Sequence, residues 1–154
     1  MNDFGFGRGA PEASGCPIGA HIRRANPRDG LAPTAGDEEV FLRASNNHRM
    51  LRRGRKFGPP HEQDPNAMRG LLFIAINTDI VRQFEFVQQT WMLNPRFADL
   101  FDETDPLMGP KGHFTVPDKP VRARVEVDTF VRLAGGDYFF LPSLSALRYL
   151  AQLR

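Results

Sequence analysis

Residues 70–77 read Gly-Leu-Leu-Phe-Ile-Ala-Ile-Asn and contain the longest apolar run of the chain. Side chains at consecutive strand positions point to opposite faces, so an unbroken apolar run is typical of a central strand covered on both sides. Residues 79–92 follow and predict a helix. Asn77 or Thr78 is expected to cap this helix, and Asp79 lies in its first turn, where a carboxylate complements the helix dipole.

The segments around this strand and helix indicate an antiparallel sheet with helices packed on it. Strand patterns fall at residues 48–53, 113–116, 125–133 and 138–141, and the Gly-Gly-Asp turn at 135–137 predicts a hairpin between the last two. We also expect one or two helical turns within 18–25, a short strand or turn at 39–43, and a helix at 144–153 capped by Ser143. This order predicts an α+β fold of ferredoxin-like plan.

Length and composition favour a single domain over residues 1–154. The first 69 residues are rich in Gly, Pro, Arg and Asp and poor in long apolar runs, whereas most aliphatic and aromatic side chains come later. We therefore expect these 69 residues to be loops that wrap another group, with residues 1–45 as an irregular arm that carries His21. Residues 46–154 are expected to form the ferredoxin-like core.

Charge and cysteine content exclude several classes of protein. The net charge is only +2, which argues against a nucleic-acid partner and leaves the basic segment 49–56 as a weaker alternative reading. Cys16 is the single cysteine, so neither an intrachain disulfide nor a thiolate zinc cluster is expected. The N-terminus lacks signal-peptide character, and no apolar run approaches the ~20 residues of a membrane helix. We expect a soluble, cytoplasmic protein without a membrane partner.

His21 is the most informative single residue. It lies in Cys-Pro-Ile-Gly-Ala-His-Ile-Arg-Arg, residues 16–24, directly after a Pro/Gly turn and before two arginines. An imidazole in this setting suits a metal ligand beside a bound anionic group, and imidazole is a normal ligand of haem iron. By itself the pattern is a weak indication, and a surface or helix-capping histidine is the preferred interpretation.

Several blocks of sequence, in this order, resemble the C-terminal half of the dye-decolorizing haem peroxidases. They are residues 16–28, 47–54, 70–74, 82–91, 94–97, 105–107 and 137–143, and the resemblance covers residues 14–153. It implies haem b as the cofactor and hydrogen peroxide as a substrate. It also implies an organic electron donor, such as a phenol or a dye, that is oxidised in one-electron steps.

The resemblance implies that His21 is the proximal ligand of the haem iron and that Asp105 accepts a hydrogen bond from its other ring nitrogen. Such an acceptor orients the imidazole and raises its basicity. Asp105 is equally well explained as a turn aspartate before proline. Arg23 or Arg24 would pair with a haem propionate, or would be a surface residue.

On the other side of the haem, the resemblance implies that Arg52 is the distal arginine. A fixed guanidinium there would stabilise negative charge on the departing oxygen as peroxide is cleaved. Arg53 should point to the opposite face of the strand. Leu71 and Phe73 share one strand face and would either wall the distal cavity or pack in the core.

For the other aromatic and histidine side chains, we prefer a structural interpretation to a functional one. Phe84, Phe86, Val87, Trp91 and Met92 are read mainly as core. Packing is also the preferred reading of Trp91, Tyr138 and Tyr149, with electron relay to bulky substrates as the alternative. The spacing of the other histidines, His48, His61 and His113, does not suggest a zinc site.

One block of the family is missing from these 154 residues. Family members carry Gly-x-x-Asp-Gly in a first ferredoxin-like domain, with an aspartate that handles protons at the peroxide, and no such pattern occurs here. We therefore expect the chain to be weakly active or inactive alone and to need a partner bearing that domain, or a homo-oligomer. The alternative is a non-catalytic ferredoxin-like remnant or self-association module.

Overall fold

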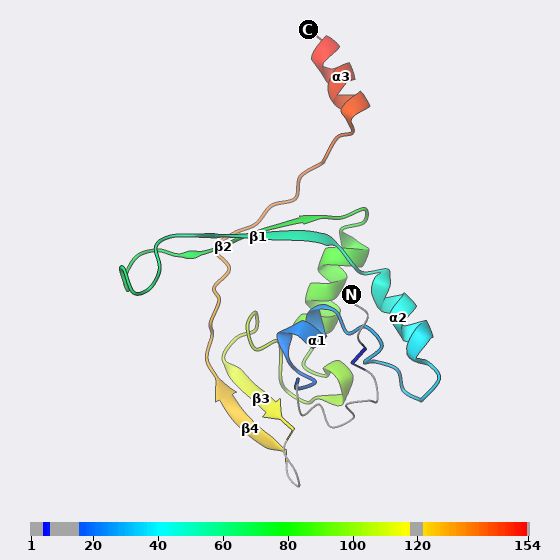
Figure 1. Ribbon diagram of the computed structural model, residues 1–154, viewed down its shortest axis with the longest axis vertical. Coiled ribbons are helices and arrows are strands. Elements are labelled where there is room, and N and C mark those ends of the chain that lie inside the picture. Colours follow the sequence, from blue (N-terminus) through cyan, green and yellow to red (C-terminus); the bar gives the residue numbers. More distant parts are fainter. Residues whose placement is uncertain (1–4, 7–15, 118–121, 154) are drawn as a thin grey trace.

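The computed structural model describes residues 5–6, 16–117 and 122–153. Its elements follow in the order α1 (His21–Ala25), α2 (Glu38–Asn46), β1 (Leu51–Phe57), β2 (Gly70–Ile76), η1 (Val81–Glu85), η2 (Val87–Met92), η3 (Phe97–Asp99), β3 (Gly112–Val116), β4 (Ala123–Val127) and α3 (Leu144–Gln152) (Figure 1). Helices and antiparallel strands are both present, so the predicted α+β class is confirmed. No helix in the described ranges is long and apolar enough to cross a membrane.

The strands form two separate antiparallel ribbons. In the first, β1 pairs with β2 so that Leu51 lies opposite Ile76 and Phe57 opposite Gly70. In the second, β3 pairs with β4 from Gly112 opposite Val127 onward. Each sheet has two strands in the described part of the chain. The β1–β2 ribbon reaches out beyond the helices, and α3 stands apart at the end of an extended segment (Figure 1).

The prediction of a covered central strand at residues 70–77 is wrong for the described chain. The strand itself is present as β2, but its sole described ladder partner is β1. Leu71 and Leu72, which point to opposite faces, are 62% and 56% exposed. The apolar pattern shows that both faces suit burial, yet it does not supply the elements that would cover them.

Other elements differ from their predictions for local reasons. Residues 39–43, expected as a strand or turn, lie in α2, where Glu39 and Arg43 form an i,i+4 ion pair. Neither Asn77 nor Thr78 caps the next helix; instead the Asp79 carboxylate accepts a hydrogen bond from Arg82 N at 2.9 Å. That helix consists of the π-helical segments η1 and η2 rather than α-helical turns.

The C-terminal region is only partly as expected. The strand β3 is confirmed, and α3 begins at the predicted cap, where Ser143 Oγ accepts a hydrogen bond from Ala146 N at 3.2 Å. The strand expected at 125–133 ends at Val127, and residues 138–141 form no strand, so the predicted hairpin is wrong. Residues 128–143 are extended and join no β-ladder among the described residues.

The apolar core is small and lies around the π-helical segments. Its buried members are Val87, Trp91, Phe97 and Leu100. The expected irregular arm contributes to this core, because Ile18 and Leu31 pack against it and α1 contacts η2. The arm also contains α1 and most of α2, while its residues 1–4 and 7–15 lie outside the described residues.

We predict that Phe97→Ala lowers the free energy of unfolding by about 3–5 kcal/mol, because removal of the buried ring leaves a cavity. Phe97 is 4% exposed, whereas Phe101 is 70% exposed. Phe101→Ala is therefore the matched control and should change stability by no more than about 0.5 kcal/mol. Urea unfolding followed by fluorescence of Trp91, the single tryptophan, measures both. Equal losses in the two variants would contradict this description of the core.

Candidate functional site

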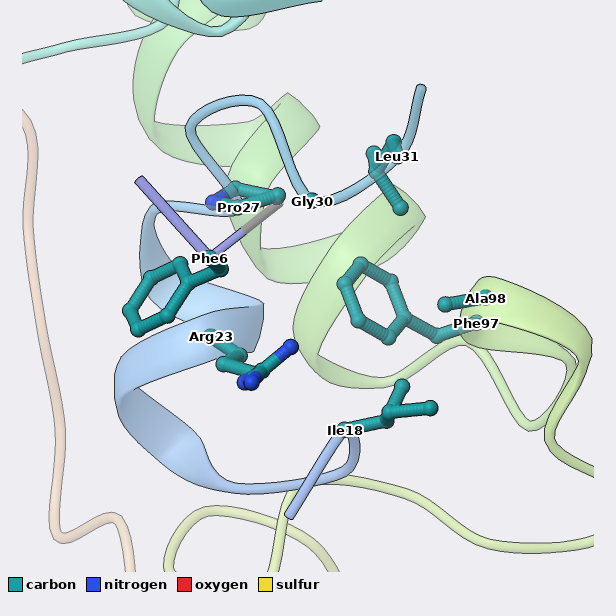
Figure 2. A pocket seen from close by; sticks show the side chains of 8 residues that line it. All are labelled: Phe6, Ile18, Arg23, Pro27, Gly30, Leu31, Phe97 and Ala98. Atoms are coloured by element: carbon teal, nitrogen blue, oxygen red, sulfur yellow. The ribbon is translucent and has the colours of Figure 1, made fainter. Parts of the chain in front are cut away.

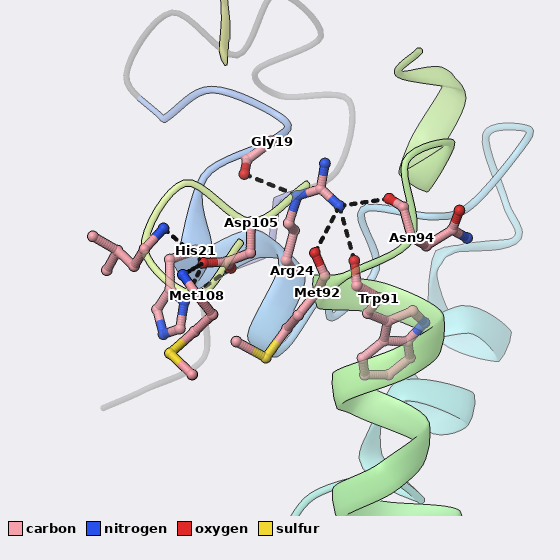
Figure 3. A network of polar contacts seen from close by, with 9 residues as sticks. Gly19, His21, Arg24, Trp91, Met92, Asn94, Asp105 and Met108 are labelled. Carbon is pink, nitrogen blue, oxygen red and sulfur yellow. Dashed lines mark hydrogen bonds and ion pairs between the residues drawn. The ribbon is translucent and has the colours of Figure 1, made fainter. Parts of the chain in front are cut away.

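His21 and Asp105 form a hydrogen-bonded pair. A turn with a hydrogen bond from Ala20 N to Pro17 O places His21 at the first residue of α1. Its Nδ1 lies 2.9 Å from Asp105 Oδ2 and 3.1 Å from Oδ1 (Figure 3). The His21 side chain is 35% exposed and that of Asp105 is fully buried. With Nδ1–H donating to the carboxylate, Nε2 has no hydrogen-bond partner among the described residues.

The backbone around Asp105 holds its carboxylate in place. Oδ1 accepts hydrogen bonds from the N–H groups of Leu107 and Met108, each at 2.9 Å. Burial tends to raise the pKa of Asp105, but the hydrogen bonds from His21, Met108 and Leu107, together with the charge of His21, outweigh burial and leave the pKa below its usual value. Asp105 therefore stabilises its own turn and also accepts a hydrogen bond from His21. The turn aspartate and the partner of His21 are thus compatible interpretations of this residue.

Arg24 joins α1 to the rest of the core. Its guanidinium is fully buried and donates to five backbone carbonyls: Gly19 (3.1 Å), Trp91 (2.9 Å), Met92 (3.3 Å), Asn94 (2.9 Å) and Glu103 (2.9 Å). Figure 3 shows the first four of these hydrogen bonds. It also lies over the Phe97 ring, with Cζ 5.0 Å from the centroid. Burial lowers the pKa of Arg24, opposed by the charges of Asp105 and Glu103. The predictions that Arg24 is a surface residue or pairs with a propionate are wrong, because its donors are used inside the protein.

Arg23 is also buried, at 8% exposure, and stacks over Phe6 with Cζ 4.7 Å from the ring centroid. It borders a cavity of about 10 Å³ whose other walls are mostly apolar (Figure 2). This volume holds roughly one water molecule. Burial contradicts the surface interpretation of Arg23, whereas its pairing with a haem propionate stays a prediction.

The β1–β2 register gathers the other expected site residues on one face. Arg52 lies opposite Ala75, Gly54 opposite Phe73, and Lys56 opposite Leu71, so Arg52, Leu71 and Phe73 share a face. Arg53, opposite Ile74, points to the other face. Phe73 packs near Phe84 of η1, with ring centroids 6.2 Å apart. Among the described residues, no hydrogen bond or ring contact joins this face to His21, and both sites connect through the η1–η2 helix.

The remaining aromatic residues divide into packed and exposed groups. Trp91 is buried, and the His48 ring stacks on Phe86 with centroids 3.9 Å apart. Packing is therefore confirmed for Trp91. Tyr149 is exposed in the described chain, so packing is wrong for it, whereas Tyr138 is exposed on one side and packs edge-to-face on Phe84, with ring centroids 6.1 Å apart. Tyr138 donates a hydrogen bond to Glu85 at 2.9 Å, which raises the pKa of its hydroxyl.

Sequence reasoning missed the structural role of Arg24. Arginine is seldom fully buried, and an arginine beside another arginine reads as part of a solvated basic surface. Its position three residues after His21 in a predicted helical turn was the available signal, since residues at i and i+3 lie on one helix face.

Comparison with known proteins supports the sequence resemblance. No protein-family model matches the chain. A multifunctional dye peroxidase of Amycolatopsis is 37% identical over 88% of this chain and 32% of the relative, and a dye-decolorizing peroxidase of Mycetinis scorodonius is 34% identical over 96% and 32%. The solved structure of a DyP-type peroxidase of Anabaena superposes with a TM-score of 0.69 at 28% identity, covering 84% of this chain and 29% of that one.

The resemblance to the dye-decolorizing peroxidases is thus confirmed, and the chain is homologous to them. It spans about a third of the length of the curated relatives it matches. This partial coverage fits the predicted match to the C-terminal half of such a peroxidase.

We predict that the low pKa of Asp105 makes stability depend on acid pH. Because folding favours the ionised carboxylate, this contribution is present above the ordinary value of 3.8 and is lost as pH falls through the lower folded pKa. Asp105→Asn should therefore lower the free energy of unfolding at pH 7 by about 1.5–3 kcal/mol, the usual contribution of hydrogen bonds to a charged group. Between pH 4 and pH 2 the variant should lose less of its remaining stability than the wild type does. Urea unfolding at several pH values measures both effects.

Asp102→Asn is the matched control, because Asp102 lies in the same loop but is exposed. It also has a positive φ of 55°, which asparagine tolerates as well as aspartate does. The control should keep the acid-induced loss seen in the wild type. An unchanged pH profile in Asp105→Asn would contradict the assignment.

Proposed function

We propose that this chain is the haem-ligating part of a dye-decolorizing-type peroxidase, with His21 as the axial ligand of haem b iron. The observation that carries this proposal is the His21–Asp105 pair. Its Nδ1 is bound to a buried, ionised carboxylate, and its half-exposed ring leaves Nε2 without a described partner. Histidines that bind metals almost always donate their other ring N–H to such an acceptor.

The residues around the pair fit a haem better than a metal held by protein donors alone. The described residues contain no group of three or more His, Cys, Asp or Glu side chains that could hold a metal ion. A single imidazole suits an iron whose other equatorial ligands come from a porphyrin. Ile22, beside His21, and Leu107 and Met108, beside Asp105, are exposed apolar side chains suited to the face of a macrocycle.

Bound haem would supply the redox chemistry by which hydrogen peroxide is reduced and an organic donor, such as a phenol or dye, loses electrons one at a time. In this proposal His21 holds the iron, and Asp105 keeps the Nδ1–H tautomer and raises the basicity of Nε2. Arg52 donates hydrogen bonds to the peroxide oxygen on which negative charge develops. Leu71 and Phe73, on the same ribbon face, exclude water around Arg52.

The activity of a whole peroxidase extends beyond this chain, which spans about a third of its relatives. We propose that residues 1–154 act as one domain in the cytoplasm and associate with a domain that supplies the Gly-x-x-Asp-Gly aspartate. The exposed apolar side chains of β2 support such an association, because large exposed apolar patches commonly mark interaction sites. A homo-oligomer is the alternative arrangement.

We predict that the purified chain binds one equivalent of ferric haem with a Soret band, and that His21→Ala weakens binding at least about 10-fold. This expectation follows because loss of the axial ligand should cost no less than loss of an outer-shell partner. Added imidazole should restore the spectrum. His113→Ala, at an exposed histidine of β3, is the control and should bind haem as the wild type does.

An unchanged haem spectrum in His21→Ala would exclude the ligand assignment. Failure of the wild-type chain to bind haem in stoichiometric amount would favour the non-catalytic association module instead. Visible absorption titration separates these outcomes.

We predict that Arg52→Leu slows the reaction with hydrogen peroxide of the haem-loaded chain, assembled with a domain that bears the Gly-x-x-Asp-Gly aspartate, by about 10²–10³-fold while haem stays bound, because one donor to the developing charge is lost. Arg53→Leu is a closely matched control on the neighbouring residue, whose side chain lies on the opposite face of β1. Stopped-flow absorbance gives both rates relative to the wild type. Equal rates for the two variants would remove Arg52 from its proposed role.

A further inference from the structure

We propose that Arg24 is a positioning residue for the His21–Asp105 pair and thereby controls the reduction potential of the haem iron. The inference rests on the proposed haem ligation by His21. Arg24 does not contact His21 in this role; it acts through the backbone that carries Asp105.

The hydrogen bonds of Arg24 close a ring of contacts around the pair. Arg24 lies three residues after His21 in α1, and its Nη1 donates to Met92 O at 3.3 Å. The same carbonyl accepts a hydrogen bond from Asp105 N at 2.8 Å. The Asp105 carboxylate then returns to His21 Nδ1 at 2.9 Å. The ring therefore runs from α1 through Arg24, Met92 and Asp105 back to α1.

A second hydrogen bond of Arg24 holds the loop just before Asp105 in the chain. Arg24 Nη2 donates to the carbonyl of Glu103, two residues before Asp105, at 2.9 Å. Two points of attachment, at residue 103 and at the carbonyl shared with residue 105, define both the position and the orientation of this loop. A point charge at the same place would supply fewer directed hydrogen bonds than the planar fork of arginine.

The loop needs such support because its own backbone is not regular. Ala98, Asp99 and Asp102 have positive φ values of 50°, 62° and 55°, a region that disfavours residues other than glycine. Strained backbone of this kind persists only where surrounding contacts hold it. Arg24 also lies over the ring of Phe97, immediately before these residues, with Cζ 5.0 Å from the centroid.

The position of Asp105 matters for the iron because a carboxylate on Nδ1–H increases electron donation from the opposite ring nitrogen. Outer-shell hydrogen bonding of this kind tunes the potential of a haem. If Arg24 is altered, the loop shifts, the hydrogen bond to His21 weakens, and the ferrous form gains relative to the ferric form. A residue needed only for folding would not alter this balance in molecules that remain folded and haem-bound.

The test compares Arg24→Lys and Arg24→Gln with Asp105→Asn, all in the haem-loaded full chain. Redox titration and the Fe–His stretching band of the ferrous form are measured, with folding checked by Trp91 fluorescence. At a fixed solution potential, Asp105→Asn should raise the ferrous-to-ferric ratio, because His21 then donates less electron density to the ferric iron. The Arg24 variants should shift it in the same direction by a smaller factor. Arg43→Lys, at an exposed arginine of α2, should leave it unchanged.

The double variant Arg24→Lys/Asp105→Asn decides whether Arg24 acts through Asp105. If it does, the double variant should have the ratio of Asp105→Asn alone. Additive shifts would overturn the proposal, as would folded Arg24 variants with wild-type potential and Fe–His band beside a shifted Asp105→Asn. If Arg24→Lys does not fold, Arg24→Gln replaces it in the single and the double variant. If His21→Ala leaves the haem spectrum unchanged, the proposed function fails, and this inference fails with it.

Discussion

The structure depends on one buried cation bound to backbone carbonyls. The last carbonyls of a helix lack hydrogen-bond partners within the helix. A positive charge at that end also interacts favourably with the negative end of the helix dipole. Arg24 meets both needs at the end of η2, where it binds the carbonyls of Trp91, Met92 and Asn94. The apolar core has four buried members among the described residues, so this polar contact is a large part of what holds α1, η2 and the following loop together.

The ribbon that carries Arg52 depends on register rather than on burial. A slip of one residue in the pairing of β1 with β2 would exchange Arg52 for Arg53 on the face shared with Leu71 and Phe73. Contact between the rings of Phe73 and Phe84 ties this face to the helix against which α1 packs. The Arg52 face of the ribbon and the His21 site, far apart in the sequence, thus both contact the π-helical segments η1 and η2.

Local signals were sufficient for part of the fold and the site. Ser143 as a cap, the strand β3 and a short helix around His21 follow from residue type and spacing, and the family resemblance pointed to Asp105 as the partner of His21. The burial of β2 was not predictable, because an apolar run shows that a strand suits burial but not whether a neighbour covers it. The full burial of Arg24 was not predicted either, since it depends on carbonyls supplied by distant segments. The π-helical turns were also beyond sequence reasoning, because their i→i+5 hydrogen bonds, such as that from Leu93 N to Gln88 O, leave no distinct pattern of residue types.

The β1–β2 ribbon has a consequence for the handling of this chain in solution. A strand edge that pairs with nothing presents free N–H and C=O groups to other molecules, and charged side chains protect against such adhesion. Four of the seven residues of β1 are Arg or Lys, whereas β2 carries no charge at all. The outer edge of β2, left open in the described chain, is therefore where intermolecular β-pairing and aggregation would begin, and covering it would favour a monodisperse preparation.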